Sequence, residues 1–357
     1  MRAHREVNAV IKYLGSKRRL LEHILADVAA CDGVQSVLDL FSGTARVGHA
    51  LKARGYRVHA NDHNAYAHVL ARCYVAADAR RWIAKAERLI PELNAVAPRA
   101  GWFTHTFCER SRYLQPENGA RVDAIRDRIA ALALPAELEA IALVSLMEAA
   151  DRVDSTVGLQ MAYLKQWSAR SYQPLQMRLP ALLDGEGAAS CLEAIEAASQ
   201  VAADLAYIDP PYNQHSYLGN YHVWESLVRW DQPEVYGVAM KRVDVRTRAS
   251  AFNRRGGHAA AMRAVLEAVR ARWLVVSFSD EGFLTLEALR ALLAERGRVR
   301  ETGIAYPRYI GHKLGIHDAK GRKVGTPGPA GNREHLFVVE TGLAAPTRRR
   351  RVLATAV

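Results

Sequence analysis

The feature that most constrains the fold of this chain is a glycine turn between an apolar run and a helical run. Residues 36–41 form a short apolar run, Ser-Val-Leu-Asp-Leu-Phe, which is typical of a buried parallel strand. A Ser-Gly-Thr turn follows, and residues 45–54 have the pattern of a helix that ends at Gly55. Residues 56–60 form a second strand-like run. This strand–turn–helix–strand order favours an α/β fold with a parallel sheet.

The rest of the chain divides into parts with different patterns. Strand-like runs return at 205–208, 273–278 and 335–340, with helical stretches at 258–272 and 284–296. Between about 65 and 186 such runs are absent, Ala, Arg and Leu recur at helical spacing, and loops are marked by Asn118-Gly119, Pro135, Pro174 and Pro180. We therefore predict an α/β sheet with helices on both faces (residues 1–64 and 187–342), a helical insertion (65–186) and a basic tail (343–357).

Composition excludes several classes of protein. The chain has 49 Lys and Arg against 37 Asp and Glu, a net charge of +12, which favours a polyanionic partner, although an arginine-rich proteome would give the same excess. No apolar run is long enough to cross a membrane, and no apolar block follows the basic N-terminus, so we expect neither a span nor a secretory signal. Four cysteines without a C-x-x-C pair predict reduced thiols in a cytoplasmic protein and no zinc site.

The glycine turn is the first candidate binding site. Gly43 allows the backbone to approach a ligand closely, and the following helix start adds N–H donors. Asp62 follows the second strand, where an acidic residue commonly accepts the ribose hydroxyls of an adenosine-containing cofactor. Glycine turns alone are common in α/β folds, so the prediction depends on the whole combination.

The second candidate is the segment Asp209-Pro-Pro-Tyr212, directly after the run 205–208. Two consecutive prolines stiffen the loop and remove two N–H donors. A carboxylate at Asp209, the carbonyl of Pro210 and the aromatic face of Tyr212 together suit the exocyclic amino group of a flat base. A rigid turn without chemistry is the alternative interpretation.

Taken in order, these segments resemble the S-adenosylmethionine-dependent amino-methyltransferases of DNA, in which F-x-G-x-G binds the methyl donor and (D/N/S)-P-P-(Y/F) forms the catalytic loop. Residues 11–17, Ile-Lys-Tyr-Leu-Gly-Ser-Lys, are similar to the N-terminal segment of Dam-like adenine enzymes. Asn118-Gly119 and the segment 213–222 are similar to the Fok-type branch, and the segment 273–282 matches a strand and S-(Y/F)-x-x-E-G turn found late in the family. The resemblance covers about residues 8–340, in the alpha-type order.

The resemblance implies a Rossmann-like methyltransferase sheet that binds S-adenosylmethionine, with no metal. Asp209, Pro210 and Tyr212 would be catalytic. The expected cofactor-binding residues are Lys12, Tyr13, Lys17, Asp39, Phe41, Ser42, Gly43, Thr44, Asp62 and Asp209. Two departures stand out. Ala45 replaces the usual second glycine, and either Ser190 or Glu193 would take the place of the acidic residue near the cofactor adenine.

The expected activity is methyl transfer to N6 of adenine in double-stranded DNA, with the base flipped out of the helix. Methylation of cytosine at N4 is the alternative, because both bases present an exocyclic amino group; an RNA methyltransferase is less favoured. A non-catalytic DNA-binding module is an alternative of another class. A restriction endonuclease is an expected partner, unless the enzyme marks DNA on its own. The basic cluster predicted to contact phosphates consists of Arg242, Arg246, Arg248, Arg254 and Arg255.

Overall fold

The computed structural model describes residues 11–15, 17–307, 316–317, 323–325 and 331–343. Its centre is a seven-stranded sheet in the order β3-β2-β1-β4-β7-β11-β8. The first five strands of that order are parallel, and β11 runs antiparallel to both β7 and β8. The strands are β1 (Ser36–Asp39), β2 (Arg57–Asn61), β3 (Ala188–Ser190), β4 (Leu205–Ile208), β7 (Trp273–Ser279), β8 (Gly297–Pro307) and β11 (Gly331–Thr341). This mostly parallel order confirms the Rossmann-like α/β prediction.

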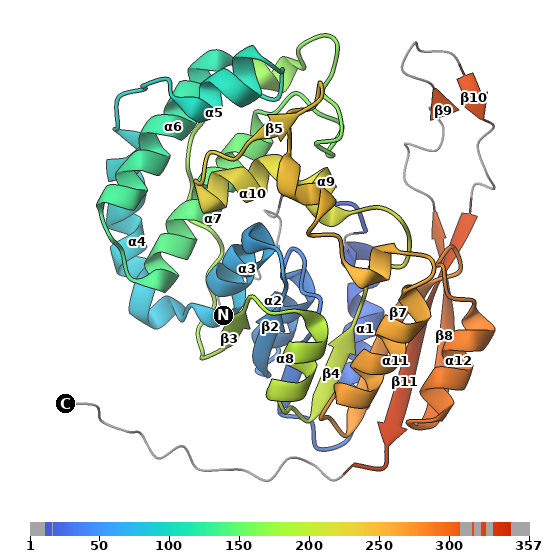
Figure 1. Ribbon diagram of the computed structural model, residues 1–357. Coiled ribbons are helices and arrows are strands. Elements are labelled where there is room, and N and C mark those ends of the chain that lie inside the picture. Colours follow the sequence, from blue (N-terminus) through green and yellow to red (C-terminus); the bar gives the residue numbers. More distant parts are fainter. Residues whose placement is uncertain (1–10, 16, 308–315, 318–322, 326–330, 344–357) are drawn as a thin grey trace.

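Helices cover both faces of the sheet (Figure 1). Side chains alternate between the faces along each strand, so Val37 belongs to one hydrophobic cluster and Leu38 to the other. The first cluster contains residues of α1 (Leu21–Ala29), α2 (Arg46–Ala53), α3 (Ala65–Ala71), α4 (Ala79–Asn94), α6 (Pro116–Ala131), α7 (Ala136–Arg152) and α10 (His222–Arg229). The second contains residues of α8 (Ala194–Gln200), α11 (His258–Ala268) and α12 (Leu286–Ala294). The short helices α5 (Trp102–Thr104) and α9 (Tyr217–Asn220) are the remaining α-helices in the described part of the chain.

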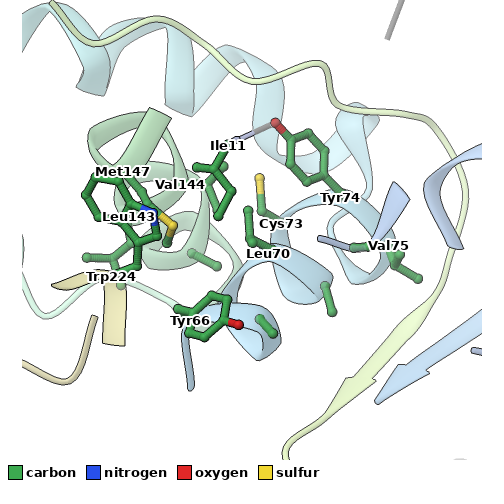
Figure 2. Packing of buried hydrophobic residues seen from close by; sticks show 14 of the residues in the cluster. Ile11, Tyr66, Leu70, Cys73, Tyr74, Val75, Leu143, Val144, Met147 and Trp224 are labelled. Carbon is green, nitrogen blue, oxygen red and sulfur yellow. The ribbon is translucent and has the colours of Figure 1, made fainter. Parts of the chain in front are cut away.

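The segment 65–186 contains no strand, as predicted; it is mostly helical up to Arg152 and mostly irregular from 153 to 186. Its helices do not have a hydrophobic core of their own, because they share the first cluster with the sheet. Figure 2 shows Tyr66 and Leu70 of α3 packed with Val144 and Met147 of α7 and with Trp224 of α10. The same cluster continues to the strands. The block is thus anchored on the sheet, and its assignment as a separate recognition unit stays a prediction.

Two expectations about elements were wrong. Asn118-Gly119 lies inside α6 and not in a loop, because Gly119 allows close packing against Thr104 and Cys108. The strand β8 was not predicted at all. It lies at the edge of the sheet, where most of its described side chains are exposed, so it lacks the apolar run of a central strand.

Further elements lie outside the main sheet. Two antiparallel ribbons pair β5 (Val235–Tyr236) with β6 (Lys241–Arg242) and β9 (Ile316–His317) with β10 (Lys323–Gly325). Residues 344–357, with the predicted basic tail, lie outside the described residues. Among the helices that are described, none is both long enough and apolar enough to cross a membrane.

Candidate active site

A pocket of about 760 Å³ opens where β1 and β4 end. These two strands are neighbours in the sheet, and β1 also pairs with β2, so the sheet order reverses direction at this point. The turn after β1 and the loop after β4 therefore meet at one edge. The pocket is lined by nine of the ten residues predicted to bind the cofactor: Tyr13, Lys17, Asp39, Phe41, Ser42, Gly43, Thr44, Asp62 and Asp209.

The glycine turn is fixed by Asp62. The backbone N–H of Gly43 donates to Asp62 Oδ2 at 3.0 Å, and Asp62 Oδ1 accepts from the Asn64 N–H at 2.9 Å. Gly43 has φ +50°, a conformation that favours glycine, and a Cβ there would lie 3.3 Å from the Tyr13 hydroxyl. Ala45, at the position of the second glycine, also has a positive φ, +58°. Its methyl group is completely buried, so the fold accommodates the departure.

Some buried polar atoms of the residues that line this pocket lack a partner within the described residues. Asp39 Oδ1 and Ser42 Oγ make no hydrogen bond within the described residues, and both residues line the pocket. The other Asp39 oxygen accepts from the Gly48 N–H at 3.0 Å. Burial, together with the charge of Asp209, raises the Asp39 pKa to about 7. Unpaired buried polar atoms are costly, so these atoms fit the polar groups of a bound cofactor.

Asp209 begins a loop that is held by its neighbours. The Phe283 N–H donates to the Tyr212 carbonyl at 2.7 Å, and His258 Nε2 lies 3.1 Å from the Pro211 carbonyl. The Tyr212 ring packs edge-to-face on Phe278. These contacts and the two prolines make the loop a rigid platform beside the pocket.

The Asp209 carboxylate is paired with Lys17, whose Nζ lies 3.0 Å from Asp209 Oδ1. Burial raises the Asp209 pKa to about 6; Lys17 opposes this rise, and the nearby charge of Glu334 adds to it. Asp209 is thus a carboxylate at neutral pH, in a site where only part of its side chain meets solvent. A rigid acceptor beside a cofactor-sized pocket suits transfer to a weakly nucleophilic amino group.

Sequence comparison identifies the family. The family model of D12 class N6 adenine-specific DNA methyltransferases matches residues 13–281. The chain belongs to this family. The description of the family and the names of the curated relatives are those of DNA methyltransferases, and the family's description names N6 of adenine and not N4 of cytosine.

This methyltransferase has curated relatives that are named Type II methyltransferases or modification methylases. It is 29% identical over 308 residues to the methyltransferase M.FokI of Planomicrobium okeanokoites, covering 80% of this chain and 47% of the relative. It is 28% identical over 319 residues to M.NlaIII of Neisseria lactamica, covering 85% and 93%. The modification methylase StsI of Streptococcus sanguinis is 28% identical, with 80% and 46% covered. The chain thus spans about half the length of M.FokI and StsI but nearly all of M.NlaIII.

Solved structures resemble the methyltransferase only loosely. An S-adenosylmethionine-dependent methyltransferase from Agrobacterium tumefaciens is 12% identical, with a TM-score of 0.33, and the match covers 92% of this chain and 63% of that one. The fold is therefore best described by its own strand order.

Lys12 does not join the pocket of this methyltransferase. Its ammonium lies 2.7 Å from Asp154 Oδ1 and 3.5 Å from Asp151 Oδ2, and its backbone N–H donates to the Asp151 carboxylate. Lys12 thus ties the N-terminal segment to the end of α7. The prediction that it anchors the cofactor is not supported by this position.

The basic cluster divides into different environments. Arg242 is 1% exposed and forms bidentate pairs with Asp231 and Asp244, so the prediction that it contacts a phosphate is wrong. Arg248 lines the pocket and pairs with Glu225, which is fully buried, at 2.9 Å. Three arginines are exposed, and their contact with phosphates stays a prediction: Arg246, Arg254 and Arg255.

A second hollow lies beside Phe41 and Asp62, and Glu193 lines it. Ser190, the other candidate for this place, donates its hydroxyl to Asn61 Oδ1 at 2.8 Å and is also in contact with His59. Of the two alternatives, Glu193 therefore faces a space that a ligand can enter, while Ser190 belongs to a network that joins β2 to β3.

Sequence reasoning missed several residues in and near the pocket, among them Arg46, Asn253 and Glu334. Arg46 and Asn253 line the pocket, and Glu334 lies 3.6 Å from the ammonium of Lys17. Arg46 is the first residue of α2, so its closeness to the glycine turn was a usable signal. Glu334 belongs to the antiparallel strand β11, and nothing in its local sequence marks it as a neighbour of Asp209.

Proposed function

We propose that this methyltransferase transfers a methyl group to N6 of a flipped adenine at a specific site in double-stranded DNA, as the modification enzyme of a restriction–modification system. The observation that carries this proposal is that Asp209 and the Phe41–Thr44 turn line the same pocket. Family membership supports the choice of adenine. The Type II relatives support a pairing with a restriction endonuclease. Such an enzyme must reach the DNA that it modifies, and we propose that it acts in the cytoplasm.

The catalytic loop provides acceptors for the target amino group. The lone pair of that nitrogen is delocalised into the ring, which makes it a poor nucleophile. Hydrogen bonds to the Asp209 carboxylate and the Pro210 carbonyl would favour a more tetrahedral nitrogen and stabilise the positive charge that develops on it. Tyr212 would stack on the base once it has left the helix. The bound donor supplies an already activated methyl group, so positioning accounts for most of the catalysis.

The remaining pocket residues would hold the cofactor. Asp62 would accept hydrogen bonds from the ribose hydroxyls of the donor. Glu193 lines the adjacent hollow, which would hold the adenine of the donor. The unpaired oxygens of Asp39 and Ser42 would be satisfied by polar groups of the donor. Tyr13 stacks on Tyr217 and Tyr221 and forms an aromatic wall against Gly43.

The test is nucleoside mass spectrometry of DNA from cells that express the protein, with single-molecule sequencing to locate the modified site. We expect N6-methyladenine in one short sequence context. Dominant N4-methylcytosine without N6-methyladenine would show that the adenine assignment fails, and absence of both would remove the proposed activity. Cleavage protection by the methylated DNA then tests the endonuclease pairing.

Two variants divide the roles within the site. Asp209→Ala should abolish transfer and leave donor binding nearly unchanged, because Asp209 meets the target base. Asp62→Ala should weaken donor binding by about 1.5–3 kcal/mol, the range for hydrogen bonds to a charged group. Isothermal titration with S-adenosylmethionine measures both. If the folded Asp209→Ala protein loses the donor, or Asp62→Ala binds it normally, this division of roles is incorrect.

A further inference from the structure

Three charged side chains form a buried group beside the catalytic loop. The Lys17 ammonium lies 3.0 Å from Asp209 Oδ1 and 3.6 Å from Glu334 Oε2. The side chains of Lys17 and Glu334 are 8% and 7% exposed, and that of Asp209 is 18% exposed. One cation is therefore shared by two carboxylates, and the group carries a net negative charge.

Glu334 is difficult to explain as a stabilising residue. Asp209 alone already neutralises Lys17, so Glu334 adds a second buried negative charge, and burying charge is expensive. Its contact with Lys17 is longer than a charge-assisted hydrogen bond. Its Oε2 has no hydrogen-bond partner within the described residues. A carboxylate in this state is ready to accept a donor that it does not yet hold.

The resting contact between Lys17 and Asp209 conflicts with catalysis. Asp209 Oδ1 is occupied by the ammonium, whose positive charge also weakens the carboxylate as an acceptor. The proposed reaction needs that carboxylate to accept from the target amino group and to stabilise a nitrogen that becomes positive. Lys17 must release Asp209, and a buried ammonium cannot do so without another partner.

We propose that Glu334 is a positioning residue for methyl transfer: it takes over the Lys17 ammonium when the target amino group reaches Asp209. The inference rests on the proposed function of Asp209. The movement is short, because shortening the 3.6 Å contact to a charge-assisted hydrogen bond of about 2.8 Å requires less than 1 Å. No covalent bond forms or breaks, and the ammonium keeps its proton. Glu334 thereby leaves Asp209 with its full charge for the base.

Other titratable groups surround the three. Burial raises the pKa of the Tyr207 and Tyr217 hydroxyls well above the usual value, so both are neutral at ordinary pH. Asp39 interacts with Asp209 across the pocket, and Tyr212 lies with its ring centroid 6.0 Å from the Lys17 ammonium. Lys17 and Glu334 are the charged groups that act most strongly on Asp209, in opposite directions.

The pH dependence follows from these signs. Asp209 must be ionised to accept, and its pKa in the free protein is about 6, so kcat/KM of the wild type should rise with pH through about 6. Glu334→Gln keeps the shape of the side chain and removes its charge. In this variant residue 334 no longer repels the negative charge of Asp209, and Lys17 pairs with Asp209 alone. The Asp209 pKa should therefore fall, and the acid limb of the pH–rate profile should move to lower pH. At the same time kcat should drop about tenfold, the effect of one ordinary hydrogen bond, with KM for DNA and donor unchanged.

The control is Glu340→Gln on the same strand, a half-exposed residue paired with Arg272 at the surface. It should change neither kcat nor the acid limb. Lys17→Gln supplies a second test, because Glu334 acts through Lys17: Glu334→Gln should cause no further loss of kcat in that background. The proposal is overturned if Glu334→Gln lowers kcat equally in the wild type and in Lys17→Gln. It is also overturned if Glu334→Gln lowers kcat without moving the acid limb of the pH–rate profile.

A measurement without substrate separates this inference from the proposed function. Titration of ¹³C-labelled aspartate carboxyls in the free protein should show a lower Asp209 pKa in Glu334→Gln than in the wild type. An unchanged Asp209 pKa defeats the proposal. If the wild type makes no N6-methyladenine but the carboxyl titration shifts, then the charge coupling is real and the proposed function is what fails.

Discussion

At the scale of residues, the conformation of the glycine turn can be tested by a matched pair of substitutions. Gly43 and Gly55 both have positive φ, +50° and +89°, so alanine at either should cost about 1 kcal/mol of unfolding free energy. A Cβ at Gly55 meets open space, whereas one at Gly43 lies 3.3 Å from the Tyr13 hydroxyl, beside the pocket. We expect both variants to lose stability, and only Gly43→Ala to lose donor affinity. Denaturant unfolding and isothermal titration measure the two effects; equal donor affinities would show that the turn does not contact the donor.

At the scale of elements, α6 shows how packing decides the use of a glycine. Gly119→Ala should favour the helix by about 1 kcal/mol if propensity alone mattered. The added Cβ would instead lie 2.5 Å from Cys108 Sγ and 3.1 Å from Thr104 Oγ1. We therefore expect a net loss of about 1–3 kcal/mol, typical of overpacking, and partial recovery in Gly119→Ala with Cys108→Ala. Urea unfolding tests both. A stabilised single variant would mean that α5 and α6 can move apart freely.

At the scale of the whole molecule, the net charge of +12 predicts salt-dependent DNA binding. Arg246, Arg254 and Arg255 are exposed and lie close in sequence to the pocket residues Arg248 and Asn253. Replacing all three by alanine should lower the log–log slope of affinity against salt by up to about 0.9 per lost phosphate contact. The control replaces Arg263 and Arg290, which pair with glutamates at exposed positions, and it should leave the slope unchanged. Fluorescence anisotropy at several salt concentrations measures the slope for the wild type and for each variant. If the triple variant has the same slope as the wild type, these three arginines do not contact the DNA phosphates.

The central strands and the two loops of the site could be predicted from the sequence, because each depends on contiguous residues. β1, β4 and β7 are apolar runs since both faces of the sheet are covered, and the glycine turn and the Asp209 loop carry their chemistry in a few adjacent positions. The edge strand β8 has no such pattern, since an exposed strand does not need apolar residues.

Tertiary structure alone decided which charged side chains are structural and which face the pocket. By local sequence Arg242 and Lys12 look like surface cations, yet Asp231 and Asp244 hold the first and Asp154 the second. Pairing of β11 with β7 and β8 brings Glu334 to Lys17 and Asp209. The sequence shows how many charged residues the chain has and where they stand along it. It does not show the residues with which they form ion pairs. Those are set by which strands and loops the folded sheet brings within a few ångströms, where burial makes each pairing strong.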